Sequence, residues 1–205
     1  MTIAAILLAA GASMRMGQPK PLVAWAGRTL LEWELDQLAA SCVDEVVVVL
    51  GSRAELVRRT LGPRAERLIF NQRWPQGRAT SLAKGAASLL APGRTRPEAV
   101  VIQNVDQPAL TRVIDSLVSE LLERRIDAIQ PTYLDATRKA HGGHPVVVAS
   151  TLLEELTAVT EATEGLRAVL QRHPPLRLAM PNEPSVALDL DTPEALAEGR
   201  RVMGT

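Results

Sequence analysis

The residues of this chain that are best suited to chemistry are two cations near its start and three carboxylates much further along. Arg15 and Lys20 lie in a segment that has two glycines and no acidic residue. Asp106 follows an apolar run, and Asp189 and Asp191 stand near the end of the sequence. Arg and Lys bind phosphate groups, and Mg²⁺ prefers one or two carboxylates together with substrate phosphates. These residue types indicate a site for a phosphorylated ligand and a divalent metal.

The two cations follow an apolar run, residues 3–10, that ends at Gly11. An uninterrupted run of this kind is typical of a strand buried on both faces of a parallel sheet. The loop after it offers a hydroxyl at Ser13 and a second glycine at Gly17. We therefore expect a strand that delivers an anion-binding loop.

Two common phosphate-binding motifs do not fit this loop. A P-loop has Lys and then Ser or Thr directly after its last glycine, but Gln18 follows Gly17 and Pro19 removes a backbone donor. A dinucleotide fingerprint has glycines at its first, third and sixth positions, and the residues after Gly11 do not keep that spacing. A plain strand-to-helix turn with solvated cations stays open at this point.

The loop resembles the signature L-A-A-G-x-S-x-R-M-G-x-x-K of nucleotidyltransferases that join a nucleoside monophosphate to a phosphate ester. Within that superfamily the chain resembles the MobA-like NTP transferases that act on the molybdenum cofactor. The cytidylyltransferase branch is favoured, because guanylyl-transferring relatives tend to have Gly where this chain has Ala10. The resemblance implies that Arg15 and Lys20 are catalytic cations, and that the nucleotide is bound by Leu8, Ala9, Ala10, Gly11, Ser13, Arg15, Gly17 and Lys20.

A second polar segment, residues 71–81, runs from an expected short strand, residues 68–70, into a helical pattern. Free amides and the dipole at a helix N-terminus favour an anion or a carbonyl oxygen. The residues alone leave open a simple capping and turning role. In the family this position has an Asn, then a Gly followed four residues later by Ser, and the resemblance assigns nucleotide binding to Asn71, Gly77 and Ser81.

Asp106 stands just beyond the expected strand 99–102, at the edge where open α/β sheets bind ligands. It could instead cap the helix that follows. The resemblance implies that Asp106 is catalytic and a metal ligand in an Asp-x-Pro motif, although relatives often have Gly or Cys where this chain has Val105.

The last acidic group stands at the end of residues 186–190, which we expect to be the final strand. Alternation would put Asp189 and Asp191 on one face of it, and Asp191 or Thr192 can cap the last helix with Pro193 near its first turn. Relatives have Asp-x-Asp-Thr-Pro here. We expect Asp189 to be the second ligand of Mg²⁺ and Asp191 to be the cap.

Two histidines, His141 and His144, are separated by glycines that break the helix a metal pair of this spacing would need, so we expect no zinc site. The Gly143-His144-Pro145 triplet resembles one in the cytidylyltransferases beside the second substrate. The resemblance assigns substrate binding to Gly143 and His144.

Composition limits the other classes of function. The net charge is zero, so nothing suggests a nucleic-acid or anionic-membrane partner. The N-terminal apolar run is too short for a bilayer, and no Lys or Arg precedes it as in a signal peptide. The single cysteine, Cys42, fits a reducing cytoplasm, and we expect it to be a small buried residue at the end of a helix.

Strand and helix patterns alternate without a linker or repeat, which predicts one α/β domain over residues 1–205 with a largely parallel sheet between two layers of helices. The resemblance adds a three-layer, Rossmann-like fold with a mixed sheet of about seven strands. It also implies Mg²⁺-dependent transfer of CMP from CTP to the phosphate of molybdopterin, with release of pyrophosphate, and possible delivery to a client molybdoenzyme.

Alternatives remain open from the sequence. The nearest is GTP as the nucleotide for the same acceptor. A sugar-phosphate or terpenoid-phosphate nucleotidyltransferase would share the first loop, and a non-catalytic partner of a molybdoenzyme would bind nucleotide or cofactor without turnover.

Overall fold

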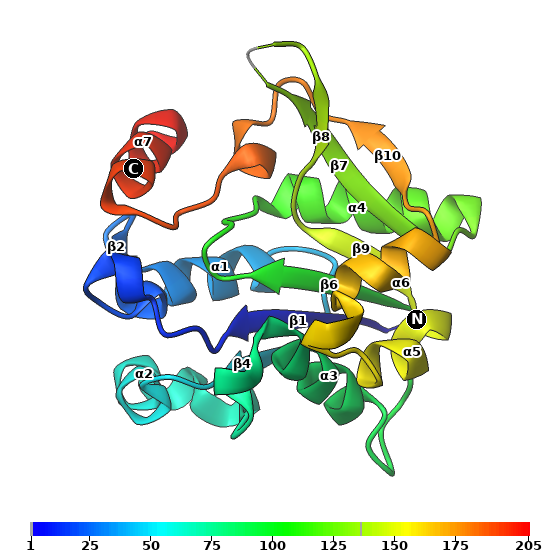
Figure 1. The fold of residues 1–205 in the computed structure, drawn as a ribbon, viewed down its shortest axis with the longest axis horizontal. Helices are drawn as coiled ribbons and strands as arrows, with labels where there is room; N and C mark the ends of the chain where they lie inside the picture. The colour runs from blue at the N-terminus through cyan, green and yellow to red at the C-terminus, as the bar shows by residue number, and fades with distance from the viewer. Residues whose placement is uncertain (1, 136) are drawn as a thin grey trace.

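A mostly parallel sheet forms the centre of the computed structural model, which describes residues 2–135 and 137–205 (Figure 1). Within these residues the strand order is β10-β7-β9-β6-β1-β4-β5, with β8 paired to β7. Among these strands, β8 and β9 run in the direction opposite to all the others. The strands are β1 Ile3–Ala9, β4 Glu45–Leu50, β5 Leu68–Phe70, β6 Ala99–Asn104, β7 Ala128–Leu134, β8 Ala140–Gly142, β9 Val146–Ala149 and β10 Leu176–Ala179.

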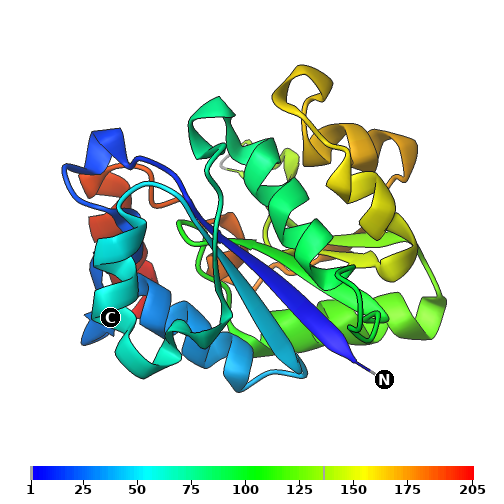
Figure 2. The ribbon, with the colours of Figure 1, turned by 90° about the horizontal axis from the view of Figure 1, so that it is seen from below.

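Helices cover both faces of this sheet (Figure 2). The apolar side chains of α3, α5 and α6 pack on one face, and those of α1, α2, α4 and α7 pack on the other. None of the helices in the described ranges is long and apolar enough to cross a bilayer. The predicted three-layer α/β fold with a mixed sheet is confirmed. The helices are α1 Leu30–Ala39, α2 Ala54–Leu61, α3 Arg78–Leu89, α4 Thr111–Arg124, α5 Leu153–Thr157, α6 Leu166–Arg172 and α7 Pro193–Met203.

The first strand shows why its sequence is apolar throughout. Every residue of β1 is buried. Ile3, Ala5 and Leu7 belong to the core on the α1 side, while Ala4, Ile6 and Leu8 belong to the core on the α3 side. Side chains alternate across a strand, so a strand with helices on both faces has no solvent-facing positions.

The start of α1 is fixed by a capping box. The Thr29 hydroxyl accepts from the amide of Glu32 at 3.2 Å, and the Glu32 carboxylate accepts from the amide of Thr29 at 2.9 Å. These two bonds satisfy donors that a helix N-terminus leaves free. A short hairpin, β2 Ala24–Trp25 and β3 Arg28–Thr29, leads into it.

The predicted final strand is wrong. Residues 184–187 form a turn of 3₁₀-helix, and the residues after it belong to no strand. The backbone of this segment bonds to single loop residues instead of a neighbouring strand. The Val186 carbonyl accepts from the amide of His144 at 3.1 Å, and the amide of Leu190 donates to the carbonyl of Asp106 at 2.8 Å. The segment is held to the core by these two backbone hydrogen bonds, and its apolar residues are buried at every second position. That spacing is the same as in a strand, so alternation alone predicted a strand here.

The expectation of a buried Cys42 is also wrong, because its side chain is exposed. Helix α1 ends at Ala39, and Cys42 lies in the loop beyond it. Its backbone amide donates to Asp115 at 2.8 Å, which ties this loop to α4.

Close packing of α3 on β1 depends on Gly85. A Cβ at this position would lie 2.5 Å from Cγ2 of Ile6 and 3.2 Å from Cγ2 of Val49. We expect Gly85→Ala to lower the free energy of unfolding by about 1–3 kcal/mol, since overpacking outweighs the better helix propensity of Ala. Urea unfolding measures this, with exposed Lys84→Ala on the same helix as the control. An equally stable Gly85→Ala protein would contradict the packing argument.

Candidate active site

The candidate site lies at the carboxyl edge of the sheet, where β1 and β6 end side by side. Leu8 of β1 is in register with Asn104 of β6. The loop after β1 and the loop carrying Asp106 therefore begin at the same level of the sheet. This is the edge at which open α/β sheets bind ligands.

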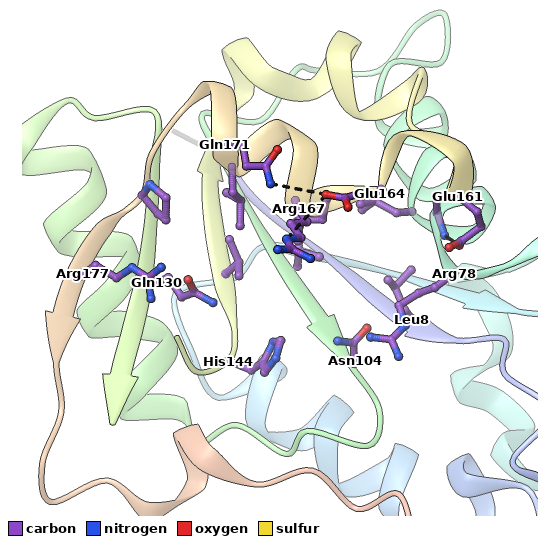
Figure 3. Close-up of a pocket in the computed structure, with 18 residues that line it drawn as sticks. Leu8, Arg78, Asn104, Gln130, His144, Glu161, Glu164, Arg167, Gln171 and Arg177 are labelled. Carbon is purple, nitrogen blue, oxygen red and sulfur yellow. Dashed lines mark hydrogen bonds and ion pairs between the residues drawn. The ribbon is translucent and has the colours of Figure 1, made fainter. Parts of the chain in front are cut away.

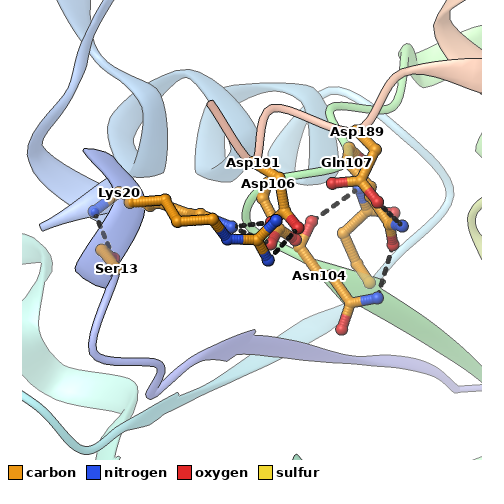
Figure 4. A network of polar contacts seen from close by, with 9 residues as sticks. Ser13, Lys20, Asn104, Asp106, Gln107, Asp189 and Asp191 are labelled. Atoms are coloured by element: carbon orange, nitrogen blue, oxygen red, sulfur yellow. Dashed lines mark hydrogen bonds and ion pairs between the residues drawn. The ribbon is translucent and has the colours of Figure 1, made fainter. Parts of the chain in front are cut away.

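Lys20 joins these two loops to the C-terminal segment (Figure 4). Its ammonium lies 2.6 Å from Oδ2 of Asp106 and also bonds to Oδ1 of Asp191. Arg15 reaches the other oxygen of Asp191 at 2.8 Å, although its side chain is 72% exposed. The predicted basic loop and the predicted acidic strand end thus meet across one cleft.

The backbone of the first loop is held by Ser13. Its hydroxyl accepts from the amide of Lys20 at 2.9 Å, so the hydroxyl closes the loop on itself. Ser13 and Gly17 both have left-handed backbone conformations, with φ of 55° and 67°. Glycine adopts that conformation without strain, which explains the residue type at Gly17.

The charges of the site act on each other's ionisation. Burial alone lowers the pKa of Lys20, but hydrogen bonds and attraction from Asp106 and Asp191 outweigh it, and the net pKa is raised. The hydrogen bond from Lys20 lowers the pKa of Asp191. Burial and the like charges of Asp106 and Asp191 raise the pKa of Asp189. A second cation would relieve this crowding of carboxylates.

The three carboxylates fit a divalent metal by their donor chemistry. Asp106, Asp189 and Asp191 each offer an oxygen, and these oxygens lie within 4.8 Å of one another. Hard oxygen donors are what Mg²⁺ and similar ions take. The assignment of Asp191 as helix cap is wrong, because the hydroxyl of Thr192 accepts from the amide of Ala195 at 3.2 Å and caps α7.

Asn71 organises the second loop from within. Its buried side chain donates to the hydroxyls of Thr80 and Ser81, both at 2.9 Å, and accepts from the amide of Arg73 at 3.0 Å. These bonds fasten the loop to the first turn of α3. At Gly77 a Cβ would lie 2.2 Å from the side chain of Glu161, so the loop passes close to the segment before α6.

The loops enclose a cavity of about 550 Å³. Gly17, Asn71 and Asp189, which the sequence assigned to the same site, do not line it. Val105 lines it and also packs into the core, as a bulky residue before the aspartate can. Of the residues assigned from sequence, the cavity is lined by Leu8, Ala9, Ala10, Gly11, Ser13, Arg15, Lys20, Gly77, Ser81 and Asp106.

A second cavity of about 700 Å³ adjoins the first, and Leu8, Arg78 and Asn104 line both (Figure 3). His144 lines the second cavity. Gly143 does not line it. A Cβ there would lie 2.3 Å from the carbonyl oxygen of Val186, so Gly143 allows a close approach of two backbones.

His141 and His144 have different surroundings. His141 bonds to Asp135 at 2.7 Å and stacks on Tyr133 in the β7–β8 hairpin. Burial lowers the pKa of His144 to about 4, an effect that the negative charge of Asp106 partly opposes and the positive charge of Arg78 reinforces. His144 is therefore a neutral imidazole at pH 7.

The sequence reasoning missed Arg78 and Asn104, which form the wall between the two cavities. Both could have been found from their neighbours. Arg78 directly follows Gly77 at the start of a helix, and Asn104 stands two residues before Asp106 at the end of a strand.

Two curated relatives align with this chain over most of its length. A nicotine blue oxidoreductase of Paenarthrobacter nicotinovorans is 30% identical over 95% of this chain and 94% of its own. A molybdenum cofactor cytidylyltransferase of Escherichia coli (strain K12) is 27% identical over 92% of this chain and 91% of its own.

Among solved structures, Rv0371c of Mycobacterium tuberculosis H37Rv superimposes with a TM-score of 0.78 at 26% identity, over 100% of this chain and 98% of that one. A complex of Rv0371c with manganese gives a TM-score of 0.72 at 23% identity, over the whole of both chains. The sequence model of the MobA-like NTP transferase domain matches residues 5–177. The chain therefore belongs to the MobA-like NTP transferase family of nucleotidyltransferases.

Proposed function

We propose that this protein is a divalent-metal-dependent cytidylyltransferase that transfers CMP from CTP to the phosphate of molybdopterin and releases pyrophosphate. The observation that carries the proposal is the position of the Lys20 ammonium, 2.6 Å from Asp106 inside a cavity lined by the family's loop. Such a site offers cations for a triphosphate and carboxylates for a metal on facing walls.

The charge of the ligand explains why both kinds of group are needed. A triphosphate carries close to four negative charges at neutral pH, and a helix terminus contributes only about 0.3–2 kcal/mol per charge. Arg15 and Lys20 supply the remaining attraction from this chain. Asp106, Asp189 and Asp191 would hold the metal, which supplies a further positive charge beside the phosphates when bound.

In the proposed reaction an oxygen of the acceptor phosphate forms a bond to the α-phosphorus of CTP. The bond from that phosphorus to the bridging oxygen breaks, and pyrophosphate leaves with the electron pair. Lys20 exchanges its carboxylate partners for phosphate oxygens and neutralises the leaving group together with Arg15. A phosphate nucleophile is already ionised, so the neutral His144 is not needed as a general base and acts by positioning.

The second cavity suits the acceptor. Its wall is apolar at Leu82, Ile102 and Val146. The charged residues that line it are Arg78, Arg167 and Arg177, with Glu161 and Glu164, and Glu164 pairs with Arg167 at 3.7 Å. The positive balance favours a ligand with an apolar body and an anionic group. Because Arg78 and Asn104 line both cavities, a phosphate at that wall would reach the nucleotide.

Molybdopterin as acceptor and CTP as donor are supported by the activity for which the E. coli relative is named and by Ala10 of the first loop. Mg²⁺ or Mn²⁺ is supported by the acidic cluster and by the manganese complex of Rv0371c. Hand-over of the product to a client molybdoenzyme, in the cytoplasm, completes the proposal.

Removal of the central carboxylate tests the site. We expect Asp106→Ala to lower kcat by about a hundredfold or more, because one electrostatic contact of this kind is worth roughly 3–4 kcal/mol in a transition state. The variant should remain folded, since Asp106 is on a loop and Lys20 keeps Asp191 as a partner. Steady-state pyrophosphate release measures kcat, with exposed Glu55→Gln on α2 as the control. Near-wild-type turnover by folded Asp106→Ala would remove this residue from the mechanism.

Nucleotide choice is tested by pyrophosphate release with CTP, GTP and ATP in the presence of molybdopterin and Mg²⁺. We expect CTP to be used best, and chelation of the metal to abolish turnover. In parallel, CTP with Mg²⁺ should raise the melting temperature more than CTP alone, because a ligand that binds the folded state stabilises it. Preference for GTP would favour the guanylyl alternative. Nucleotide binding without turnover would favour a carrier, and reduction of nicotine blue would favour the activity named for the Paenarthrobacter relative.

His144 tests the assignment of the second cavity. We expect His144→Asn to raise KM for molybdopterin several-fold, about the loss of one neutral hydrogen bond, and to leave KM for CTP nearly unchanged. Its contribution should not vary between pH 6 and 8, because the imidazole is already neutral there. An equal rise in both KM values would place His144 outside the acceptor site.

A further inference from the structure

A carboxyl group that the proposed mechanism does not use lies directly behind the acidic loop. Glu34 of α1 has a relative exposure of 0%. Among the described residues, no cation pairs with it. Taking an unpaired charge into the core costs so much free energy that a buried carboxyl group normally becomes neutral.

The contacts of Glu34 run to the β6 end that carries Asp106. The side-chain amide of Gln103, which is also 0% exposed, donates to Oε2 of Glu34 at 3.5 Å. The backbone of Ala109 also hydrogen-bonds to this carboxyl group. Glu34 therefore touches both ends of the loop on which Asp106 stands.

Two oxygens at this contact are without a partner among the described residues, Oε1 of Glu34 and Oε1 of Gln103. An ionised carboxylate only accepts hydrogen bonds, so it could satisfy neither oxygen. A carboxylic acid has an O–H that can donate to the amide oxygen. If Oε1 of Glu34 carries a proton, it can donate to Oε1 of Gln103, and both oxygens then have a partner. Together with the bond from the Gln103 amide to Oε2 of Glu34, this closes a ring of two hydrogen bonds.

We propose that Glu34 is a neutral carboxylic acid that pairs with the amide of Gln103 and acts as a positioning residue for the loop that carries Asp106. The role at the metal site rests on the proposed function, whereas the paired neutral acid does not. The direction in which the pKa of Glu34 is shifted supports the same assignment. Burial raises the pKa of Glu34 well above its ordinary range, and the negative charge of Asp106, the charged group that acts on it, raises the pKa further.

The connection from this pair to the carboxylates is a short chain of contacts (Figure 4). The Gln103 amide also donates to the backbone carbonyl of Gln107. The side chain of Gln107 accepts from Asn104 at 2.5 Å and donates to Asp189 at 3.5 Å. The carbonyl of Asp106 in turn accepts from the amide of Leu190 at 2.8 Å. The acid–amide pair thus supports two of the three carboxylates through one loop.

Two substitutions separate the proton from the hydrogen bonds. Glu34→Gln keeps a neutral group that can form two hydrogen bonds with Gln103, and Glu34→Leu keeps the volume but forms none. We expect Glu34→Gln to keep Mn²⁺ affinity and kcat within about twofold, and Glu34→Leu to lower both by about tenfold or more, the usual effect of losing a partner behind a metal ligand. Glu55→Gln, on the exposed face of α2, is the matched control.

Two further readouts do not depend on metal or turnover. In infrared spectra at pH 7 the wild type should show a carboxylic-acid C=O band that Glu34→Gln lacks and Glu55→Gln retains. Amide exchange of Leu190, which bonds to Asp106, should be faster in Glu34→Leu. If Glu34→Leu does not fold, Gln103→Met removes the same pair from the other side and should give the same acceleration.

The absence of the carboxylic-acid band from the wild type would overturn the neutral acid. Folded Glu34→Leu or Gln103→Met with unchanged Leu190 exchange and unchanged Mn²⁺ affinity would overturn the positioning role. Failure of the wild type to turn over any nucleotide would reject the proposed function alone, because the infrared and exchange results decide this inference without it.

Discussion

The ammonium of Lys20 between Asp106 and Asp191 is the interaction on which the rest of the site depends. Asp106 is 86 positions and Asp191 is 171 positions from Lys20 in the sequence. Without a cation, three carboxylates with oxygens within 4.8 Å of one another would repel strongly in a half-buried cleft. Lys20 therefore does two things in the ligand-free protein. It holds the first loop against the strand ends, and it neutralises a cluster that would otherwise push its own loops apart.

This arrangement gives the proposed reaction a simple electrostatic order. The same carboxylates serve Lys20 in one state and would serve a metal in the next, so Lys20 is free for phosphate only when another cation has taken its place. Under the proposed function, triphosphate and metal would then favour each other's binding, because each relieves the charge that the other leaves unbalanced. The buried support behind Asp106 keeps the carboxylates in place while their partners change.

Much of the fold was predictable because it depends on local pattern. Buried strands are continuously apolar, and a capping box begins α1 as its spacing indicates. The meeting of the first loop with Asp106 followed from a general rule, that parallel strands end at a common edge. Asp191 shows the limit. The sequence Asp-Thr-Pro offers two possible caps for α7. Asp191 bonds to Lys20, which is distant in the chain, and Thr192 caps the helix. The burial of Glu34 could have been predicted from sequence. It falls three residues after Leu31 and four before Leu38, on the buried stripe of its helix.

The proposed function gives the second cavity the role of selecting the acceptor. The nicotine blue oxidoreductase and the molybdenum cofactor cytidylyltransferase both align with more than nine-tenths of the chain, yet their names give different chemistry. A shared fold does not decide between reactions, so the difference has to lie in side chains that meet the second ligand. In this chain the second cavity is lined by Gln130 of β7, Arg167 of α6 and Arg177 of β10, together with His144. The proposed reaction would need the acceptor phosphate near Arg78 and Asn104, which line both cavities. Under the proposed function, the arginines of the second cavity, more than the nucleotide loop, would select a phosphorylated acceptor.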